Sequence, residues 1–240
     1  MNTNNVVSLL KNKVVYDLTP FSHLDYKDHL SCIVWIAGCP LRCAYCYNKD
    51  IVFAKYAKYC FNDILNFLDS RKNLLDSVVL SGGEATSVDL IYFCKEIKKK
   101  NFKIKLDTNG LNFSQIKKLI DLNLLDYIAL DFKAPRDKFK LLTKAKASYF
   151  DSLEQTVKFL VKKCFDFEIR TTVHRDLLDE NDINNMIDYL IKINYKGEYF
   201  LQNFLETEYN IGNIKNSKQI LDLDKIQDTN GKIIVKYRNF

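Results

Sequence analysis

The stretch AGCPLRCAYCYN, residues 37–48, decides most of what this chain can be. Its three cysteines, Cys39, Cys43 and Cys46, follow the pattern CxxxCxxC. Thiolates are soft ligands that suit iron–sulfur clusters or zinc. Three thiolates that lie close together without a fourth leave one metal position open. The stretch therefore predicts a metal site with one position available to another ligand.

Zinc binding and thiol redox chemistry are the competing interpretations of this loop. A structural zinc site is closed by four ligands, commonly in two pairs, and the chain has no second pair. His29 or Cys32 would have to supply the missing ligand. A redox-active Cys-x-x-Cys pair accounts for Cys43 and Cys46 but leaves Cys39 without a role. An iron–sulfur cluster is the interpretation that uses all three thiols.

Short runs rich in β-branched residues alternate with helical periodicity along the chain. The predicted strands are residues 31–36, 77–81, 102–107, 127–131, 167–173 and 199–202. The predicted helices are 88–100 capped by Ser87, 115–122 capped by Ser114, one from 151 or 152 to 164, and one from 181 or 182 to 193. Parallel strands need crossover helices, so this order predicts an α/β fold with a parallel sheet and outer helices. A doubly wound sheet and an open or closed barrel fit the pattern equally.

Polar residues follow the predicted strands where each strand ends. SGGE at 81–84 follows the second strand, DTNG at 107–110 the third, DFK at 131–133 the fourth and His174 the fifth. Reactive residues gather at the carboxyl ends of parallel strands. Each group alone also has a structural interpretation: a turn, an ion pair between Asp131 and Lys133, or a loop histidine with its hydrogen bonds satisfied. A site is indicated because all of these groups follow the carboxyl ends of predicted strands.

Taken together, CxxxCxxC with an aromatic residue before the third cysteine, GGE, DTNG and DxK resemble the radical S-adenosylmethionine (SAM) superfamily. The closest resemblance is to its glycyl-radical-enzyme activating branch, in the short form that activates anaerobic ribonucleoside-triphosphate reductase. The resemblance implies a partial (βα)6 barrel. It covers a radical SAM core at 19–209, between an N-terminal extension at 1–18 and a C-terminal segment at 210–240 whose role is open. The chain departs from the family in having Lys27-Asp28 where Pro-Gly is usual.

The resemblance also implies roles for the strand-end residues. Cys39, Cys43 and Cys46 would be the catalytic residues, holding a 4Fe–4S cluster whose fourth iron binds SAM. The SAM-binding residues that it implies are Tyr45 beside the adenine, Gly82, Gly83 and Glu84 at the amino group, and Asp131, Lys133 and His174 at the ribose or methionyl part. Asp107 and Thr108 would help to hold a monovalent cation near the SAM carboxylate.

The activity that follows from the resemblance is reductive cleavage of SAM. The 5′-deoxyadenosyl radical would then abstract hydrogen from a glycine of a glycyl radical enzyme, with anaerobic ribonucleotide reductase as the expected partner. Flavodoxin or ferredoxin would donate the electron. One alternative is a radical SAM enzyme that acts on a small molecule, similar to 7-carboxy-7-deazaguanine synthase. Another is a zinc or electron-transfer protein without catalysis.

Composition limits the other classes of function. The net charge of +6 comes mainly from lysines on the outer faces of predicted helices, so nucleic-acid binding is not expected. No apolar run approaches the ~18 residues of a membrane span and no signal peptide is recognisable, which predicts a cytoplasmic protein. The remaining cysteines, Cys32, Cys60, Cys94 and Cys164, are expected to be packing residues. A helix near 220–226 and a strand at 232–237 are predicted for the C-terminal segment.

Overall fold

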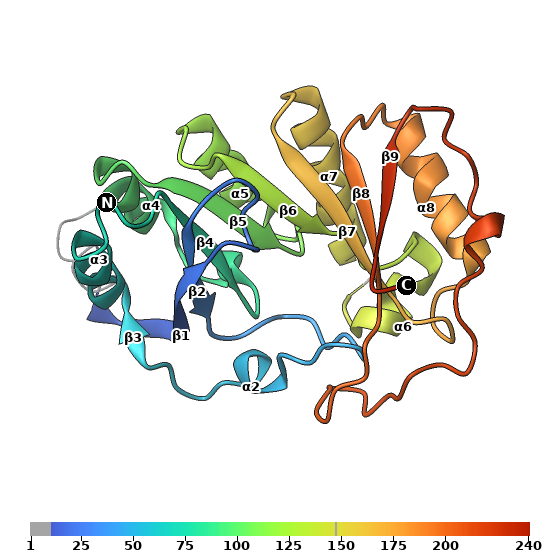
Figure 1. The fold of residues 1–240 in the computed structure, drawn as a ribbon, viewed down its shortest axis with the longest axis horizontal. Helices are drawn as coiled ribbons and strands as arrows, with labels where there is room; N and C mark the ends of the chain where they lie inside the picture. Colours follow the sequence, from blue (N-terminus) through green and yellow to red (C-terminus); the bar gives the residue numbers. More distant parts are fainter. Residues whose placement is uncertain (1–10, 147) are drawn as a thin grey trace. The chain divides into compact units, whose positions relative to one another are not determined.

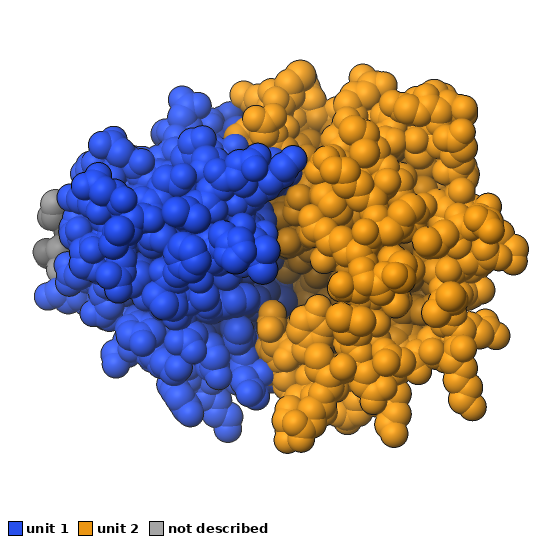
Figure 2. All heavy atoms as spheres, viewed as in Figure 1, with its two compact units in different colours: residues 1–40, 50–108, 114–128 blue, residues 41–49, 109–113, 129–240 orange. Residues whose placement is uncertain are grey.

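The computed structural model describes residues 11–146 and 148–240. The chain forms two compact units, which are coloured separately in Figure 2. The first contains the described residues up to Pro40, together with 50–108 and 114–128. The second contains 41–49, 109–113 and 129–240. Residues 1–10 of the predicted N-terminal extension lie outside the described part, and the first strand, β1 (Lys13–Ser22), runs across the predicted limit at residue 18.

The strands of the first unit lie in the order β3-β1-β2-β4-β5 (Figure 1). β2 (Ser31–Ile36), β4 (Ser77–Gly82) and β5 (Lys103–Thr108) are parallel. β1 pairs antiparallel with β2, and the short β3 (Tyr59–Cys60) pairs antiparallel with β1. The helices of this unit are α3 (Phe61–Asp69) and α4 (Ile91–Lys99), together with α2 (Lys49–Val52) and α5 (Phe113–Asp121) apart from the first residue of each.

Apolar side chains cover both faces of the parallel strands in this unit. Phe61 of α3 stacks on Phe93 of α4 with ring centroids 4.1 Å apart. On other strand positions, Ile33 and Val79 form a cluster with Tyr26. Strands that are covered on both sides read as continuous apolar runs, which is why these strands were recognisable in the sequence.

The strands of the second unit lie in the order β6-β7-β8-β9. β6 (Tyr127–Asp131) begins in the first unit and ends in the second. β7 (Phe167–Val173), β8 (Glu198–Asn203) and β9 (Ile234–Arg238) are parallel. The helices are α6 (Arg136–Thr143), α7 (Ser148–Lys162) and α8 (Glu180–Lys192). Tyr199 of β8, which is fully buried, places its hydroxyl 2.9 Å from Thr171 Oγ1 and 3.9 Å from Met186 Sδ of α8.

The predicted α/β fold with parallel strands is confirmed, and all six predicted strands are present. β3 and β9 each have a single neighbour, so the strands do not close into a complete barrel. The predicted strand near the C-terminus is β9. The predicted helix near 220–226 is wrong, because that stretch contains only a 3-10 turn at Leu223–Lys225. Asp222 Oδ1 accepts from the Asp224 N–H there and favours a turn over a helix.

All four predicted helix starts differ from the structure. α5 begins at Phe113, so Ser114 lies inside that helix, and α7 begins at Ser148 rather than at 151 or 152. Ser87 does not cap α4; it ends a 3-10 turn at Ala85–Ser87, and α4 begins at Ile91, whose N–H donates to Asp89 Oδ1 at 2.9 Å. α8 begins earlier than predicted, because Asp179 is its N-cap. Asp179 and Asp182 bond reciprocally to each other's backbone N–H groups, which satisfies two donors at the helix start.

The cysteines outside the CxxxCxxC loop differ in how far they are exposed. Cys32 and Cys94 are fully buried, as predicted, and burial raises the pKa of each thiol to about 12. Cys60 is half-buried. Cys164 is exposed and has a left-handed backbone (φ 50°) just after α7, so its prediction as a packing residue is wrong. Among the described residues, no helix is both long and apolar enough to cross a membrane.

Candidate active site

In the first unit, the start of the cysteine loop packs directly on the GGE turn that follows β4. The Gly83 N–H donates to Ile36 O and the Glu84 N–H donates to Gly38 O, each at 2.9 Å. A Cβ on Gly83 would lie 2.2 Å from Gly38 O and 3.2 Å from Cys39 Cβ. Only glycine permits this approach, so the sequence pattern brings Cys39 against the GGE turn.

Glu84 is held rigidly at this turn. Only 4 % of the residue is exposed, and its Oε1 accepts from Thr86 N–H at 3.1 Å, Thr86 Oγ1 at 2.6 Å and Thr108 Oγ1 at 2.7 Å. Hydrogen bonds of this kind favour the ionised carboxylate. The structure therefore joins two of the predicted site residues, Glu84 and Thr108, from the ends of β4 and β5.

Asp107, at the end of β5, is held by a neutral hydroxyl group and by a positively charged ammonium group. Ser81 Oγ donates to its Oδ2 at 3.2 Å, and Lys105 Nζ lies 3.3 Å from its Oδ1. Lys105 is 5 % exposed and also donates to the Asp25 carbonyl. Lys105 was not predicted as a site residue. Its position two residues before Asp107 could have indicated it, because residues two apart in a strand have their side chains on the same face.

In the second unit, the predicted site residues Cys43 and Tyr45 of the CxxxCxxC loop are buried. Cys43 is 5 % and Tyr45 is 4 % exposed, whereas Cys46 is half-buried. Burial raises the pKa of the Cys43 thiol to about 11, against the lowering effect of the Lys133 charge. The Tyr45 hydroxyl lies close to Cys43 but makes no hydrogen bond of ordinary geometry among the described residues. A buried hydroxyl in this state is a place where a polar group of a ligand fits.

Asp131 and Lys133, the predicted DxK pair, form an ion pair beside Cys43. Lys133 Nζ donates to Asp131 Oδ2 at 2.9 Å, and Arg170 Nε of β7 donates to Asp131 Oδ1 at 3.1 Å. Burial alone would raise the pKa of Asp131, but the charges of Lys133 and Arg170 outweigh it and hold that pKa below its usual value. Burial would lower the pKa of Lys133, but Asp131 outweighs it and raises that pKa.

Arg170, which was not predicted from the sequence, joins the pair of Asp131 and Lys133. It continues a row of charges across the strand face: its Nη1 lies 3.9 Å from Glu168 Oε1, and Glu168 Oε2 lies 4.0 Å from Arg238 Nη2 of β9. The Arg238 guanidinium lies 3.6 Å from the centre of the Phe200 ring. In the sequence, the polar residues that alternate with apolar ones in FEIRTTV (167–173) could have indicated Arg170.

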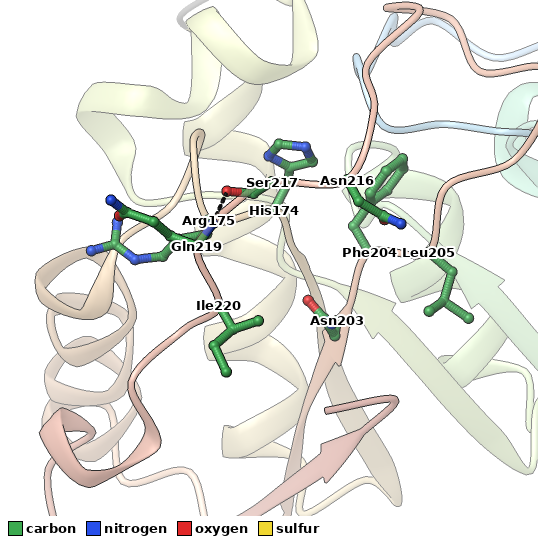
Figure 3. Close-up of a pocket in the computed structure, with 9 residues that line it drawn as sticks. All are labelled: His174, Arg175, Asn203, Phe204, Leu205, Asn216, Ser217, Gln219 and Ile220. Carbon is green, nitrogen blue, oxygen red and sulfur yellow. Dashed lines mark hydrogen bonds between the residues drawn. The ribbon is translucent and has the colours of Figure 1, made fainter.

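His174 follows β7 and lies at a cavity of about 260 Å³ in the second unit (Figure 3). Its Nε2 lies 2.7 Å from the Lys215 carbonyl, and its Nδ1 accepts from the Asp176 N–H at 3.3 Å. A carbonyl can only accept, so the imidazole carries its proton on Nε2. Both ring nitrogens of this predicted SAM-binding residue are engaged with the protein.

The donor set fits an iron–sulfur cluster with SAM better than it fits zinc. The candidate fourth zinc ligands are otherwise engaged: Cys32 is fully buried, and the His29 ring nitrogens lie 3.0 Å from Asp76 Oδ2 and 3.3 Å from Lys103 Nζ. In the first unit, Cys39 lies against the GGE turn that holds the fixed carboxylate of Glu84, which suits a soft thiolate ligand beside the ammonium group of an amino acid.

Comparison with known proteins agrees with this chemistry. Residues 33–190 match the family model of the radical SAM superfamily. A Methanocaldococcus jannaschii protein, whose name assigns it provisionally as a glycyl-radical enzyme activating enzyme, is 32 % identical over 178 residues, which are 72 % of this chain and 73 % of that protein. The pyruvate formate-lyase-activating enzyme of Clostridium pasteurianum is 31 % identical over 54 % of this chain and 58 % of its own length.

Solved structures show the same fold. The Streptococcus suis protein SuiB bound to S-adenosylmethionine matches 84 % of this chain with a TM-score of 0.65 and 15 % identity. The protein anSMEcpe with bound AdoMet matches 73 % with a TM-score of 0.58 and 21 % identity. This chain spans 48 % and 52 % of those two structures. From the sequence matches, the chain belongs to the radical SAM superfamily, within the branch of the glycyl-radical-enzyme activating enzymes.

Proposed function

We propose that this chain is a cytoplasmic activating enzyme that cleaves SAM reductively and generates a glycyl radical on anaerobic ribonucleoside-triphosphate reductase. When bound, the 4Fe–4S cluster and SAM supply a 5′-deoxyadenosyl radical that takes hydrogen from the partner's glycine. Flavodoxin or ferredoxin provides the electron. Support for the activating role comes from the M. jannaschii and C. pasteurianum relatives, and support for this partner comes from the resemblance in motifs and length.

The observation that carries the proposal is the packing of Gly83 on Gly38 and Cys39. It brings one cluster cysteine and the GGE turn into a single rigid arrangement inside the first unit. We assign Cys39, Cys43 and Cys46 as cluster ligands. Gly82 and Gly83 allow the backbone to approach SAM. Glu84, fixed by Thr86 and Thr108, accepts a charged hydrogen bond from the SAM ammonium.

The remaining roles follow the same geometry. Tyr45, buried with an unsatisfied hydroxyl, lies beside the adenine. Asp131 and Lys133 bind the ribose or methionyl part of SAM, and Arg170 positions Asp131 for this task. Thr108 and Asp107 complete the carboxylate end, where Lys105 already contributes a positive charge. For His174 to contact SAM, its bond to the Lys215 carbonyl must first be exchanged.

The experiment is an anaerobic reconstitution of the cluster, followed by reduction and addition of SAM and anaerobic ribonucleotide reductase. The EPR spectrum and the yield of 5′-deoxyadenosine are recorded in the same tube. A glycyl doublet together with 5′-deoxyadenosine is the expected result. Cys43→Ser, which removes one cluster ligand, serves as the control and should give neither signal.

Each other outcome changes the proposal in a defined way. 5′-Deoxyadenosine without a glycyl doublet would keep the radical SAM chemistry but remove this partner, and would favour a small-molecule substrate. No 5′-deoxyadenosine from protein with an intact cluster would remove the SAM-cleaving activity itself. Production of 5′-deoxyadenosine by cluster-free Cys43→Ser would contradict the assignment of the cysteines.

A further inference from the structure

The part of the CxxxCxxC loop in the second unit is held from two directions by backbone hydrogen bonds. On one side, the N–H groups of Arg42 and Ala44 donate to the carbonyls of Thr143 at 2.8 Å and Leu142 at 3.3 Å, at the end of α6. On the other side, the contacts come from the C-terminal segment. The Ile211 N–H donates to Cys46 O at 2.9 Å, and the Gly212 N–H donates to Ala44 O at 2.8 Å.

The contact at Gly212 leaves no room for a side chain. A Cβ on this residue would lie 2.8 Å from Ala44 Cβ and 2.9 Å from Ala44 O. Distances below about 3 Å require the neighbouring backbone to move, because the nearest atoms belong to the short Ala44 rather than to a flexible side chain. Gly212 is therefore needed for close approach, not for an unusual backbone conformation.

The segment that makes this contact, residues 210–217, is itself fixed, and we call it the C-terminal tether. Asn210 is 2 % exposed, and its side chain bonds to both the N–H and the carbonyl of Ile214 at 2.8 Å, which closes a turn around Gly212. His174 Nε2 then donates to the Lys215 carbonyl at 2.7 Å. Hydrogen bonds from side chains, rather than a helix or a strand, therefore fix the position of residues 211 and 212.

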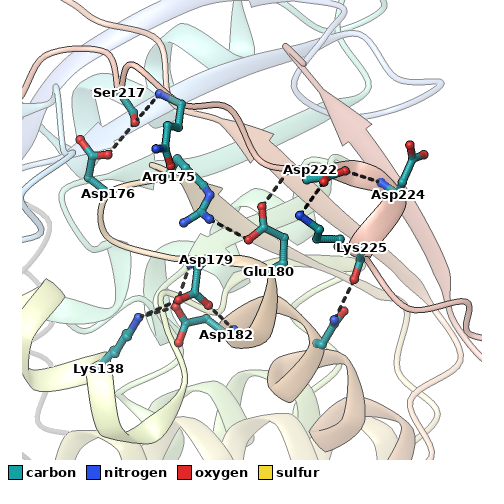
Figure 4. Close-up of polar contacts among 12 residues, drawn as sticks. Lys138, Arg175, Asp176, Asp179, Glu180, Asp182, Ser217, Asp222, Asp224 and Lys225 are labelled. Carbon is teal, nitrogen blue, oxygen red and sulfur yellow. Dashed lines mark hydrogen bonds and ion pairs between the residues drawn. The ribbon is translucent and has the colours of Figure 1, made fainter.

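At the end of the tether and beyond it, the chain is anchored to the connection between β7 and α8 and to the start of α8 (Figure 4). Ser217 Oγ donates to Asp176 Oδ1 at 2.6 Å. Glu180 Oε1 accepts from the Asp222 N–H at 2.8 Å, and Glu180 Oε2 pairs with Arg175 Nη2 at 2.9 Å. These contacts link the tether to the end of β7 and to α8.

We propose that the C-terminal tether positions the cluster loop, with Gly212 and His174 as positioning residues for the iron–sulfur cluster. The two tether bonds fix the peptide groups that follow Ala44 and Cys46. The N–H groups of Tyr45 and Tyr47 belong to those same peptide groups, so their directions are fixed too. Backbone N–H groups around a cluster are one of the determinants of its reduction potential. The inference rests on the cluster that the proposed function requires, but not on the identity of the partner enzyme.

The test uses the full-length protein with its reconstituted cluster, without SAM or partner. The variants are Gly212→Ala, which forces the tether from the loop, and Lys215→Ala, which keeps the carbonyl that His174 contacts and removes only an exposed side chain. Iron release to a chelator and the EPR spectrum of the reduced cluster are measured. Because Gly212→Ala loses two backbone hydrogen bonds, its iron release should be about tenfold faster than that of the wild type. The g-values in the EPR spectrum of its reduced cluster should also differ from those of the wild type. Lys215→Ala should match the wild type.

Two further measurements keep the test decisive if Gly212→Ala folds poorly. His174→Ala removes the donor to Lys215, while His174→Gln offers a similar one, so iron release should rise in the first and recover in the second. Hydrogen exchange of the cluster-free protein should be faster at residues 43–47 in His174→Ala. Wild-type iron release and exchange in Gly212→Ala and His174→Ala would overturn the proposal. Weaker SAM binding by His174→Ala with wild-type iron release would assign His174 to SAM and overturn its positioning role.

If wild-type protein binds its cluster but gives no glycyl radical, the activating function fails while the tether proposal is still tested by iron release. If the cluster of Gly212→Ala behaves like that of the wild type, the tether proposal fails and the activating function is untouched. The two proposals are therefore separated by measurements on the same preparations.

Discussion

The ammonium nitrogen of Lys105 lies 3.3 Å from Oδ1 of Asp107, two residues further along β5. Only 5 % of Lys105 is exposed, and it also donates to the Asp25 carbonyl. An ammonium group therefore already stands beside Asp107, where the family resemblance implies a monovalent cation. A buried ion pair adds little net stability, but removal of one partner leaves a buried charge uncompensated.

Lys105→Met is expected to lower the free energy of unfolding of the cluster-free protein by ~3 kcal/mol, because it leaves the Asp107 carboxylate without its ammonium partner. Urea unfolding followed by circular dichroism measures the change. The double variant Lys105→Met/Asp107→Asn removes both charges and should recover part of the loss. Equal stability of the Lys105→Met variant and the wild type would show that the pair is solvated and weak.

Gly83→Ala is expected to reduce cluster retention, since its Cβ would lie 2.2 Å from Gly38 O, a backbone atom next to Cys39. Iron content after anaerobic reconstitution and desalting measures this. Gly231→Ala is the matched control: Gly231 has a positive φ of 72°, but its Cβ would meet nothing within 4 Å. If both variants keep wild-type iron content, the close contact between the two loops is not required for the cluster.

The strands and the motif loops could be predicted because their signals are local. β6 and β7 have the predicted bounds, since β6 is a short, mainly apolar run and β7 is rich in β-branched residues. β1 was missed because Pro20 within it argues against a strand. β1 pairs with β3 only at Lys13 and Val15. Pro20 lies outside this pairing, so its missing N–H removes no hydrogen bond between β1 and β3.

The parts of the site that escaped prediction depend on contacts between distant segments. Arg170 and Lys105 are ordinary strand charges until the strands pair and bring them to Asp131 and Asp107. The tether has no periodicity at all, and its bond from Gly212 to Ala44 follows from tertiary packing. Tertiary contacts of this kind produce no periodic pattern in the sequence from which they could be predicted.

Arg170→Met is expected to weaken SAM binding about tenfold, since Asp131 would lose one of the two cations that orient it and lower its pKa, a charged hydrogen bond of ~1.5 kcal/mol. Isothermal titration of the reconstituted protein with SAM measures the affinity. Arg238→Met is the control, because Arg238 lies on the same row of charges but 4.0 Å from its nearest carboxylate, Glu168. The same loss in both variants would indicate a general effect of charge on SAM binding.

The anchor between Glu180 and Asp222 should weaken in acid, and the sign follows from the pKa of Glu180. Burial would raise that pKa, but the N–H groups of Asp222 and of Glu180 itself, with the charge of Arg175, outweigh burial and lower it. A lowered pKa stabilises the fold fully above the ordinary value of about 4.3, and the contribution is lost as the pH falls through the lower value in the folded state.

An NMR titration of the cluster-free protein between about pH 6 and pH 3 can follow the Asp222 amide, whose N–H donates to Glu180 Oε1 at 2.8 Å. The midpoint of its shift is expected below about 4.3, the ordinary glutamate pKa. Glu180→Gln keeps an acceptor of the same shape but cannot titrate, so its Asp222 amide should not show this transition. A wild-type midpoint at or above the ordinary value would mean that the Asp222 N–H does not stabilise the ionised carboxylate. The C-terminal segment would then depend more on its other contacts near α8, those of Asp176, Asn184 and Asp188.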